Sequence, residues 1–127
     1  MARVLIVEDE AEILELIGDV LALEGYEVHT LSRIPHGLDP IRRLDPSAIV
    51  LDLRMPGVSG IELLRLLAAD RQLRRTPVVI CTAADDLTEI HGPEFAVLGC
   101  EVVHKPFELE ELVGSVRRAV LSSESGW

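Results

Sequence analysis

Short aliphatic runs recur along the chain, and between them lie longer segments in which apolar residues return every three or four positions. Five runs predict strands, at Val4–Val7, Tyr26–His29, Ala48–Leu51, Val78–Cys81 and Glu101–His104. Three of these runs are continuously apolar, as expected for parallel strands that are covered on both faces. The second alternates between apolar and polar residues, which predicts an edge strand. Repeated alternation of strand and helix predicts a doubly wound α/β fold with right-handed crossovers.

Three of the intervening segments carry a clear helical pattern. Ala11–Glu24 places its apolar residues on one stripe, and Gly25 then ends the helix. Ser59-Gly60-Ile61-Glu62 has the spacing of a capping box and predicts a helix that continues to about Ala69. The last predicted helix takes its apolar face from Leu109, Leu112, Val113, Val116 and Val120.

Two helices carry weaker patterns because prolines interrupt them. Residues 34–44 include Pro35 and Pro40, so we expect a short helix that begins near Pro40. The segment Asp85–Leu98 has Gly92 and Pro93 in its middle. The residue before a proline is disfavoured in the helical conformation, so we expect this fourth helix to be broken, shortened or displaced.

Composition narrows the class of protein. A chain of 127 residues with 48% hydrophobic residues suits a single domain, which we place at residues 1–121, with 122–127 as a polar tail or the start of a linker. The net charge of −10 argues against direct contact with nucleic acid, whose phosphates need clustered Lys and Arg. Neither a signal peptide nor a membrane span is evident, so we expect no membrane partner and a cytoplasmic location. Cys81 and Cys100 fit buried apolar positions better than a disulfide or a zinc site.

Polar residues stand where the predicted strands end. In an open parallel sheet, ligands bind beyond the carboxyl ends of the strands, so these positions matter most. They are Glu8, Asp9, Asp52, Thr82 and Lys105. Taken singly, each has an ordinary structural explanation, such as a solvated first turn for the acids or a surface charge for the lysine. Together they favour a site.

The chemistry of this set is that of phosphoryl transfer. Clustered carboxylates raise one another's pKa unless a cation lies among them, and Mg²⁺ prefers such oxygen ligands. A lysine and a threonine hydroxyl can each bond to a phosphoryl oxygen. Asp52 itself can act as a nucleophile, because a carboxylate forms an aspartyl-phosphate when a metal neutralises the incoming group.

Four motifs now identify a resemblance: LIVEDE, IVLDLRMPGVSG, ICTA and HKPF, in this order between residues 3 and 121. The chain resembles the receiver domain of two-component response regulators. The resemblance implies a flavodoxin-like fold with strand order 2-1-3-4-5 and helices on both faces of the sheet. It also implies that Asp52 accepts a phosphoryl group from a sensor histidine kinase or a phosphotransfer protein in a Mg²⁺-dependent reaction.

The same resemblance implies roles for the neighbouring residues. Asp9, Asp52 and the backbone carbonyl of Arg54 would bind Mg²⁺, with Glu8 acting mainly through water. Thr82 and Lys105 would hold the phosphoryl oxygens, and the bond from Lys105 to Pro106 would be cis. The domain would be a switch rather than a turnover enzyme. Its output face would comprise the fourth helix, fifth strand and fifth helix and would act on an effector or output domain, with a phosphorylation-dependent homodimer as one option.

The chain departs from the family at one position, and two further positions are ones that tune the loss of phosphate in the family. Val102 stands where the family often has Tyr or Phe, so a switching aromatic ring is not available there. We therefore expect movement of Thr82 and a shift of the fourth helix to transmit the signal. Arg54 and Ala84 occupy positions that tune the loss of phosphate in the family. We expect Arg54 to affect the lifetime of the aspartyl-phosphate, although a solvated arginine that balances nearby acids explains it equally well.

Other functions remain open at this stage. A pseudo-receiver would use the same fold only for protein binding or dimerisation, and the complete set of site residues counts against it. A phosphatase of the haloacid dehalogenase type would need a second acid two residues after Asp52, where this chain has Arg54. An FMN carrier would need a hydroxyl- and glycine-rich loop after the first strand, where Glu8 and Asp9 would instead repel phosphate.

Overall fold

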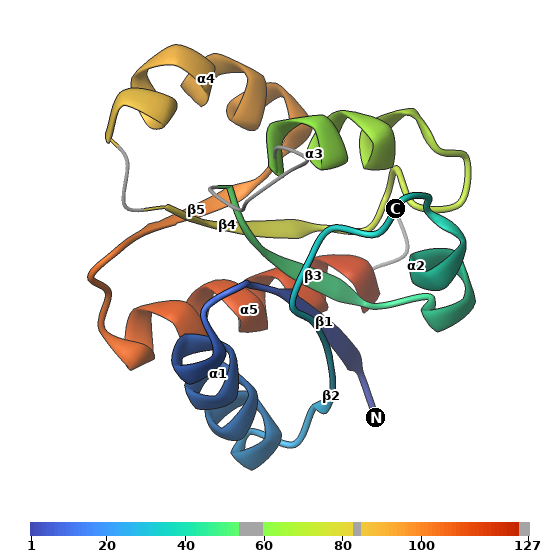
Figure 1. Cartoon of the computed structure of the whole chain (residues 1–127). Helices are drawn as coiled ribbons and strands as arrows, with labels where there is room; N and C mark the ends of the chain where they lie inside the picture. The colour runs from blue at the N-terminus through green and yellow to red at the C-terminus, as the bar shows by residue number, and fades with distance from the viewer. Residues whose placement is uncertain (54–59, 83–84, 125–127) are drawn as a thin grey trace.

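The five predicted strands form one parallel sheet (Figure 1). The computed structural model describes residues 1–53, 60–82 and 85–124, with the backbone alone for 85–91 and 124. The strands are β1 (Arg3–Val7), β2 (Glu27–Leu31), β3 (Ala48–Asp52), β4 (Val78–Thr82) and β5 (Glu101–His104). Their order is β2-β1-β3-β4-β5, which confirms both the predicted topology and the edge position of β2.

Helices cover both faces of the sheet, as Figure 1 shows. They are α1 (Ala11–Leu23), α2 (Asp39–Leu44), α3 (Gly60–Ala69), α4 (Asp85–Leu98) and α5 (Leu109–Glu124). Successive strand residues point to opposite faces, so the continuously apolar strands supply two separate cores. Leu5, Val7 and Leu51 pack with α2, α3 and α4, whereas Val4, Ile6 and Val50 pack with α1 and α5. The predicted single-domain α/β fold is therefore confirmed.

The strand register brings the carboxyl ends of four strands to one edge. Val7 of β1 pairs with Leu51 of β3, and Thr82 of β4 pairs with His104 of β5. The backbone N–H of Lys105 donates to the carbonyl of Thr82 at 2.8 Å, which extends the β4–β5 pairing by one residue. As a result, residues that are far apart in the sequence leave the sheet side by side.

The fourth helix differs from its prediction. α4 is continuous from Asp85 to Leu98 with Pro93 inside it, so the expectation that it is broken or shortened is wrong. A proline disfavours a helical residue before it through contact with that residue's Cβ. Gly92 has no Cβ, which removes part of this conflict, and the helix continues through the proline.

Two further boundaries refine the prediction. α1 begins after Glu10, which occupies the N-cap position and makes no side-chain capping hydrogen bond. α5 continues to Glu124, so Ser122 and Ser123, which we assigned to the tail, are helical. Ser59, the predicted cap of α3, lies outside the described residues. None of the helices in the described part of the chain is long and apolar enough to cross a bilayer.

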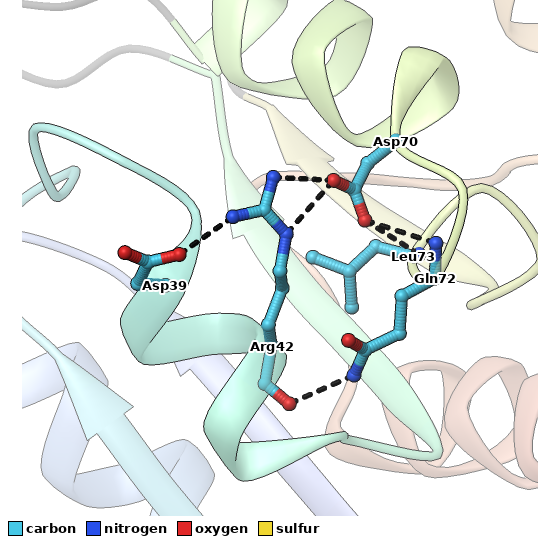
Figure 2. A network of polar contacts seen from close by, with 5 residues as sticks. All are labelled: Asp39, Arg42, Asp70, Gln72 and Leu73. Atoms are coloured by element: carbon cyan, nitrogen blue, oxygen red, sulfur yellow. Dashed lines mark hydrogen bonds and ion pairs between the residues drawn. The ribbon is translucent and has the colours of Figure 1, made fainter.

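The short α2 is tied to the loop that follows α3 (Figure 2). A helix of six residues has little stability of its own, so it needs tertiary contacts. Arg42 of α2 donates from Nε to Asp70 Oδ1 at 2.9 Å and from Nη1 to Asp39 Oδ1 at 2.6 Å. Asp70 Oδ2 in turn accepts the backbone N–H groups of Gln72 and Leu73, at 3.1 and 3.0 Å. Ile41 adds a fully buried apolar contact.

Candidate functional site

Two buried carboxylates share one lysine at the carboxyl edge of the sheet. Lys105 Nζ lies 2.7 Å from Glu8 Oε1 and 3.3 Å from Asp52 Oδ2. Glu8 is 2% exposed and Asp52 is 6% exposed, so both carboxylates are largely removed from water. Glu8 follows β1, Asp52 ends β3 and Lys105 follows β5, which is the juxtaposition that the topology predicted.

Asp9 completes a cluster of three acids. One carboxylate oxygen from each of Glu8, Asp9 and Asp52 lies within 4.8 Å of the others, and Asp9 is the most exposed of the three. These four residues, Glu8, Asp9, Asp52 and Lys105, are called the carboxylate site below. The site contains three carboxylates and one ammonium group, so its formal charge is negative although most of the site is buried. This arrangement suits a divalent cation with oxygen ligands.

The protonation behaviour of the site reflects that excess. Burial and, secondly, the contact with Asp52 together raise the pKa of the Glu8 carboxyl to about 7, against the opposing effect of Lys105. Burial also lowers the pKa of the Lys105 ammonium, but the carboxylates of Glu8 and Asp52 outweigh burial and leave the pKa above its usual value. Lys105 is therefore a full positive charge at neutral pH.

Thr82 ends β4 at the same edge and is fully buried. Beside it, burial raises the pKa of the Cys81 thiol to about 12, so Cys81 behaves as an apolar residue, as predicted. Cys100 is only partly buried, and burial raises the pKa of its thiol to about 11. Both cysteines are free thiols.

The first residue of α3, Gly60, lies against the backbone at the end of β3. The backbone N–H of Gly60 donates to the carbonyl of Leu53 at 3.2 Å. A Cβ built on Gly60 would lie only 2.7 Å from Leu53 Cα and 2.9 Å from the Asp52 carbonyl oxygen. The sequence shows this glycine only as part of a motif, because nothing in its spacing reveals that α3 begins against the backbone of Asp52.

Some predicted features lie outside the described residues. These are Arg54 with its backbone carbonyl and Ala84. The bond from Lys105 to Pro106 is cis, as the resemblance implied. Sequence reasoning missed the direct ion pair between Lys105 and Glu8. It expected Lys105 to bind a phosphoryl oxygen and Glu8 to contact Mg²⁺ mainly through water.

Comparison with known proteins agrees with this geometry. The family model described as the response regulator receiver domain matches residues 4–117. The chain belongs to this family. The receiver domain is 35% identical over 120 residues to the DNA-binding response regulator MtrA of Mycobacterium tuberculosis H37Rv, covering 91% of this chain and 49% of MtrA. It is 38% identical over 120 residues to YkoG of Bacillus subtilis, an uncharacterized transcriptional regulatory protein, covering 93% of this chain and 50% of YkoG.

The receiver domain also resembles solved structures of the same size. Chemotaxis protein CheY4 of Vibrio cholerae superposes with a TM-score of 0.82 at 27% identity, over 94% of this chain and 98% of that chain. The receiver domain spans about half the length of the curated relatives MtrA and YkoG. MtrA is named as DNA-binding, so the absence of direct contact with nucleic acid stays a prediction for this chain.

Proposed function

We propose that this receiver domain is a phosphorylation switch in which Asp52 accepts a phosphoryl group from the phosphohistidine of a sensor histidine kinase or a phosphotransfer protein. The observation that carries the proposal is the sharing of Lys105 between the buried carboxylates of Glu8 and Asp52, at 2.7 and 3.3 Å. A purely structural ion pair needs one carboxylate for one lysine. The surplus acids, Asp9 included, favour a site that receives further positive charge.

In the transfer step, a carboxylate oxygen of Asp52 forms a bond to phosphorus as the bond from phosphorus to the donor's imidazole nitrogen breaks. The electron pair of that bond stays with the imidazole, which then takes up a proton. Lys105 Nζ lies 3.3 Å from Asp52 Oδ2, close enough to donate to an oxygen of the transferred group. We assign Thr82 as the second donor. Rigid strand ends hold these groups in place, so little reorganisation is needed.

The residues present fit a magnesium ion. Three carboxylates lie within 4.8 Å of one another, and burial together with Asp52 already raises the pKa of Glu8 to about 7, so an added cation would relieve an unfavourable concentration of charge. Asp9 and Asp52 would bind it together with the backbone carbonyl of Arg54, and Glu8 would act mainly through water. Bound Mg²⁺ supplies the positive charge that offsets the phosphoryl oxygens.

We infer that the output of the switch is the face formed by α4, β5 and α5, acting on an effector or an output domain. Val102, in β5, has no ring that could turn inward. The signal therefore passes through Thr82 to α4, and a homodimer formed on phosphorylation would use the same face. Backbone amide chemical shifts before and after phosphorylation test this route. Changes at Thr82 and in α4 are expected, and changes confined to α1 would overturn the assignment.

The experiment that tests the proposed function is intact-mass measurement after incubation with acetyl phosphate and Mg²⁺. We expect the mass of one added phosphoryl group in the wild-type chain. Asp52→Ala and addition of EDTA should each abolish it. Asp19→Ala is the matched control, because Asp19 is an exposed aspartate of α1 remote from the strand ends, and it should be phosphorylated like the wild type.

The alternative outcomes are distinct. An adduct that persists in Asp52→Ala would show that another residue is the acceptor. Absence of both the adduct and Mg²⁺ binding in the wild type would favour a pseudo-receiver that works only as a binding module. An adduct that decays equally fast in Arg54→Ala and in the wild type would remove Arg54 from control of the aspartyl-phosphate lifetime.

A further inference from the structure

A polar hollow lies at the opposite edge of the sheet from the carboxylate site. Its volume is about 320 Å³, which is at the lower end of small-molecule sites. Four segments meet around it: the start of β1, the α2–β3 loop, the α3–β4 loop and the end of α5. The residues that define this arginine hollow are Arg3, Ser47, Arg75, Thr76, Ser122 and Ser123.

The two arginines of the hollow have few polar partners among the described residues. Arg3 Nη2 donates to the backbone carbonyl of Asp45 at 3.3 Å, whereas Arg3 Nε is buried without a hydrogen-bond partner. Across residues 1–53, 60–82 and 85–124, neither Arg3 nor Arg75 forms an ion pair. Within these residues, Arg3 uses one of the five N–H donors of its guanidinium group, so donors on Nη1 and Nη2 remain for a ligand that brings oxygen atoms.

Nearby negative charge offsets the charge of these arginines only in part. Asp45 also lines the hollow and keeps its negative charge, because its Oδ1 accepts a hydrogen bond only from the neutral amide of Gln72, at 3.4 Å, and Glu27 attracts Arg3 from the neighbouring strand. The terminal carbonyls of α5 add a partial negative charge of about half an elementary charge. Among the described residues, two guanidinium groups and one carboxylate line the hollow, beside the end of α5. This surplus of positive charge stands out in a chain whose net charge is −10.

We propose that the arginine hollow binds a phosphate group, either free inorganic phosphate or the end of a small phosphorylated molecule. A guanidinium fork matches the oxygens of phosphate, and such charge-assisted hydrogen bonds are the strong ones. The hydroxyl groups of Ser47, Thr76 and Ser123 supply neutral donors around the same space. Donors that arrive from four segments suit a tetrahedral oxyanion better than a planar carboxylate, which one fork alone would satisfy. The inference is independent of the proposed function.

The test is an NMR titration of the full chain with inorganic phosphate in magnesium-free buffer. We expect saturable shifts of the backbone amides of Ser47, Thr76 and Ser123. Arg3→Gln/Arg75→Gln should weaken binding by about tenfold or more. The matched control Arg43→Gln/Arg71→Gln removes the same charge from exposed arginines outside the hollow and should change affinity by less than about twofold.

A second variant keeps the test valid if loss of Arg3 impairs folding. Arg75 is exposed, so Arg75→Glu should leave the urea midpoint unchanged while it abolishes saturable binding. AMP distinguishes the two sources of phosphate: tighter binding than phosphate identifies a phosphorylated small molecule, and equal or weaker binding identifies the free anion. Shifts confined to Thr82 and Lys105, equal losses in both double variants, or no saturation would each overturn the proposal.

Discussion

Gly60→Ala is the substitution whose effect follows most directly from distances. The new Cβ would lie 2.7 Å from Leu53 Cα, 2.9 Å from the Asp52 carbonyl oxygen and 3.0 Å from the Leu53 carbonyl oxygen. Ordinary contact between carbon atoms begins near 3.5 Å, so the start of α3 must retreat by roughly 0.8 Å. All three neighbours are backbone atoms, and no side-chain rotation can relieve the contact.

The magnitude comes from three contributions. Overpacking costs about 1–3 kcal/mol, and weakening of the hydrogen bond from Gly60 N–H to the Leu53 carbonyl adds up to about 1 kcal/mol. The better helix propensity of alanine offsets about 0.5–1 kcal/mol of this loss of stability. We expect the free energy of unfolding to fall by about 1–3 kcal/mol and Tm to fall by roughly 3–12 °C.

Urea and thermal unfolding of the purified chain measure this loss, and the phosphorylation rate with acetyl phosphate measures the displacement of Asp52. A misplacement approaching 1 Å is expected to slow transfer by up to about 100-fold. Gly18→Ala is the matched control, because Gly18 lies inside α1 and its Cβ would meet only Val28 Cγ1 at 3.7 Å. It should stabilise the chain by about 0.5–1 kcal/mol. A Gly60→Ala variant as stable as Gly18→Ala would refute the reasoning.

Three further predictions rest on other contacts. Lys105→Met leaves two buried carboxylates without their cation and should lower the free energy of unfolding, measured in EDTA, by about 3 kcal/mol. Lys105→Arg should lower it by less, and equal stability of Lys105→Met and the wild type would contradict this prediction. The hydrogen bond from Arg42 holds the pKa of Asp70 below its usual 3.8, so its stabilising effect is present above pH 3.8 and is lost as pH falls through the lower folded-state value. The difference in urea unfolding between wild type and Asp70→Asn should accordingly be constant from neutral pH down to about 5 and shrink below 3.8; a difference that grows with acid would reverse the sign. Pro93→Ala restores a backbone donor inside α4 and should raise the free energy of unfolding by about 1–3 kcal/mol, and an unchanged or lower Tm would count against a helical Pro93.

Much of the fold was predictable because its signals are local. Continuous apolar runs such as Val78–Cys81 need cover on both faces, and the helical segments between them leave few ways to supply it. The meeting of Asp52 and Lys105 was also predictable, because parallel strands end at one edge and both residues follow apolar runs. The position of the carboxylate site therefore follows from the topology of the sheet, and no measured distance is needed to predict it.

What could not be predicted depends on contacts between segments. α4 continues through Pro93 although local rules for proline predict a break, and the missing Cβ of Gly92 removes part of the steric conflict. The ion pair between Lys105 and Glu8 depends on side-chain reach across the sheet edge, for which the sequence holds no pattern. The close approach at Gly60 is likewise a tertiary contact between α3 and the end of β3. Such features become visible only with coordinates.

The anchoring of α4 has a consequence for its exchange with solvent. In the part of this helix whose side chains are described, residues 92–98, Phe95 alone is buried, whereas Val97 is 86% exposed. Burial of one aromatic side chain is worth about 1.5–3 kcal/mol, so lifting this half of the helix from the sheet costs far less than unfolding the domain. α5, in contrast, packs against the sheet along its whole length through the buried side chains of Leu112, Val116 and Val120. Amide hydrogens of residues 95–98 are therefore expected to exchange through a local opening, whereas those in the middle of α5 should exchange only through global unfolding.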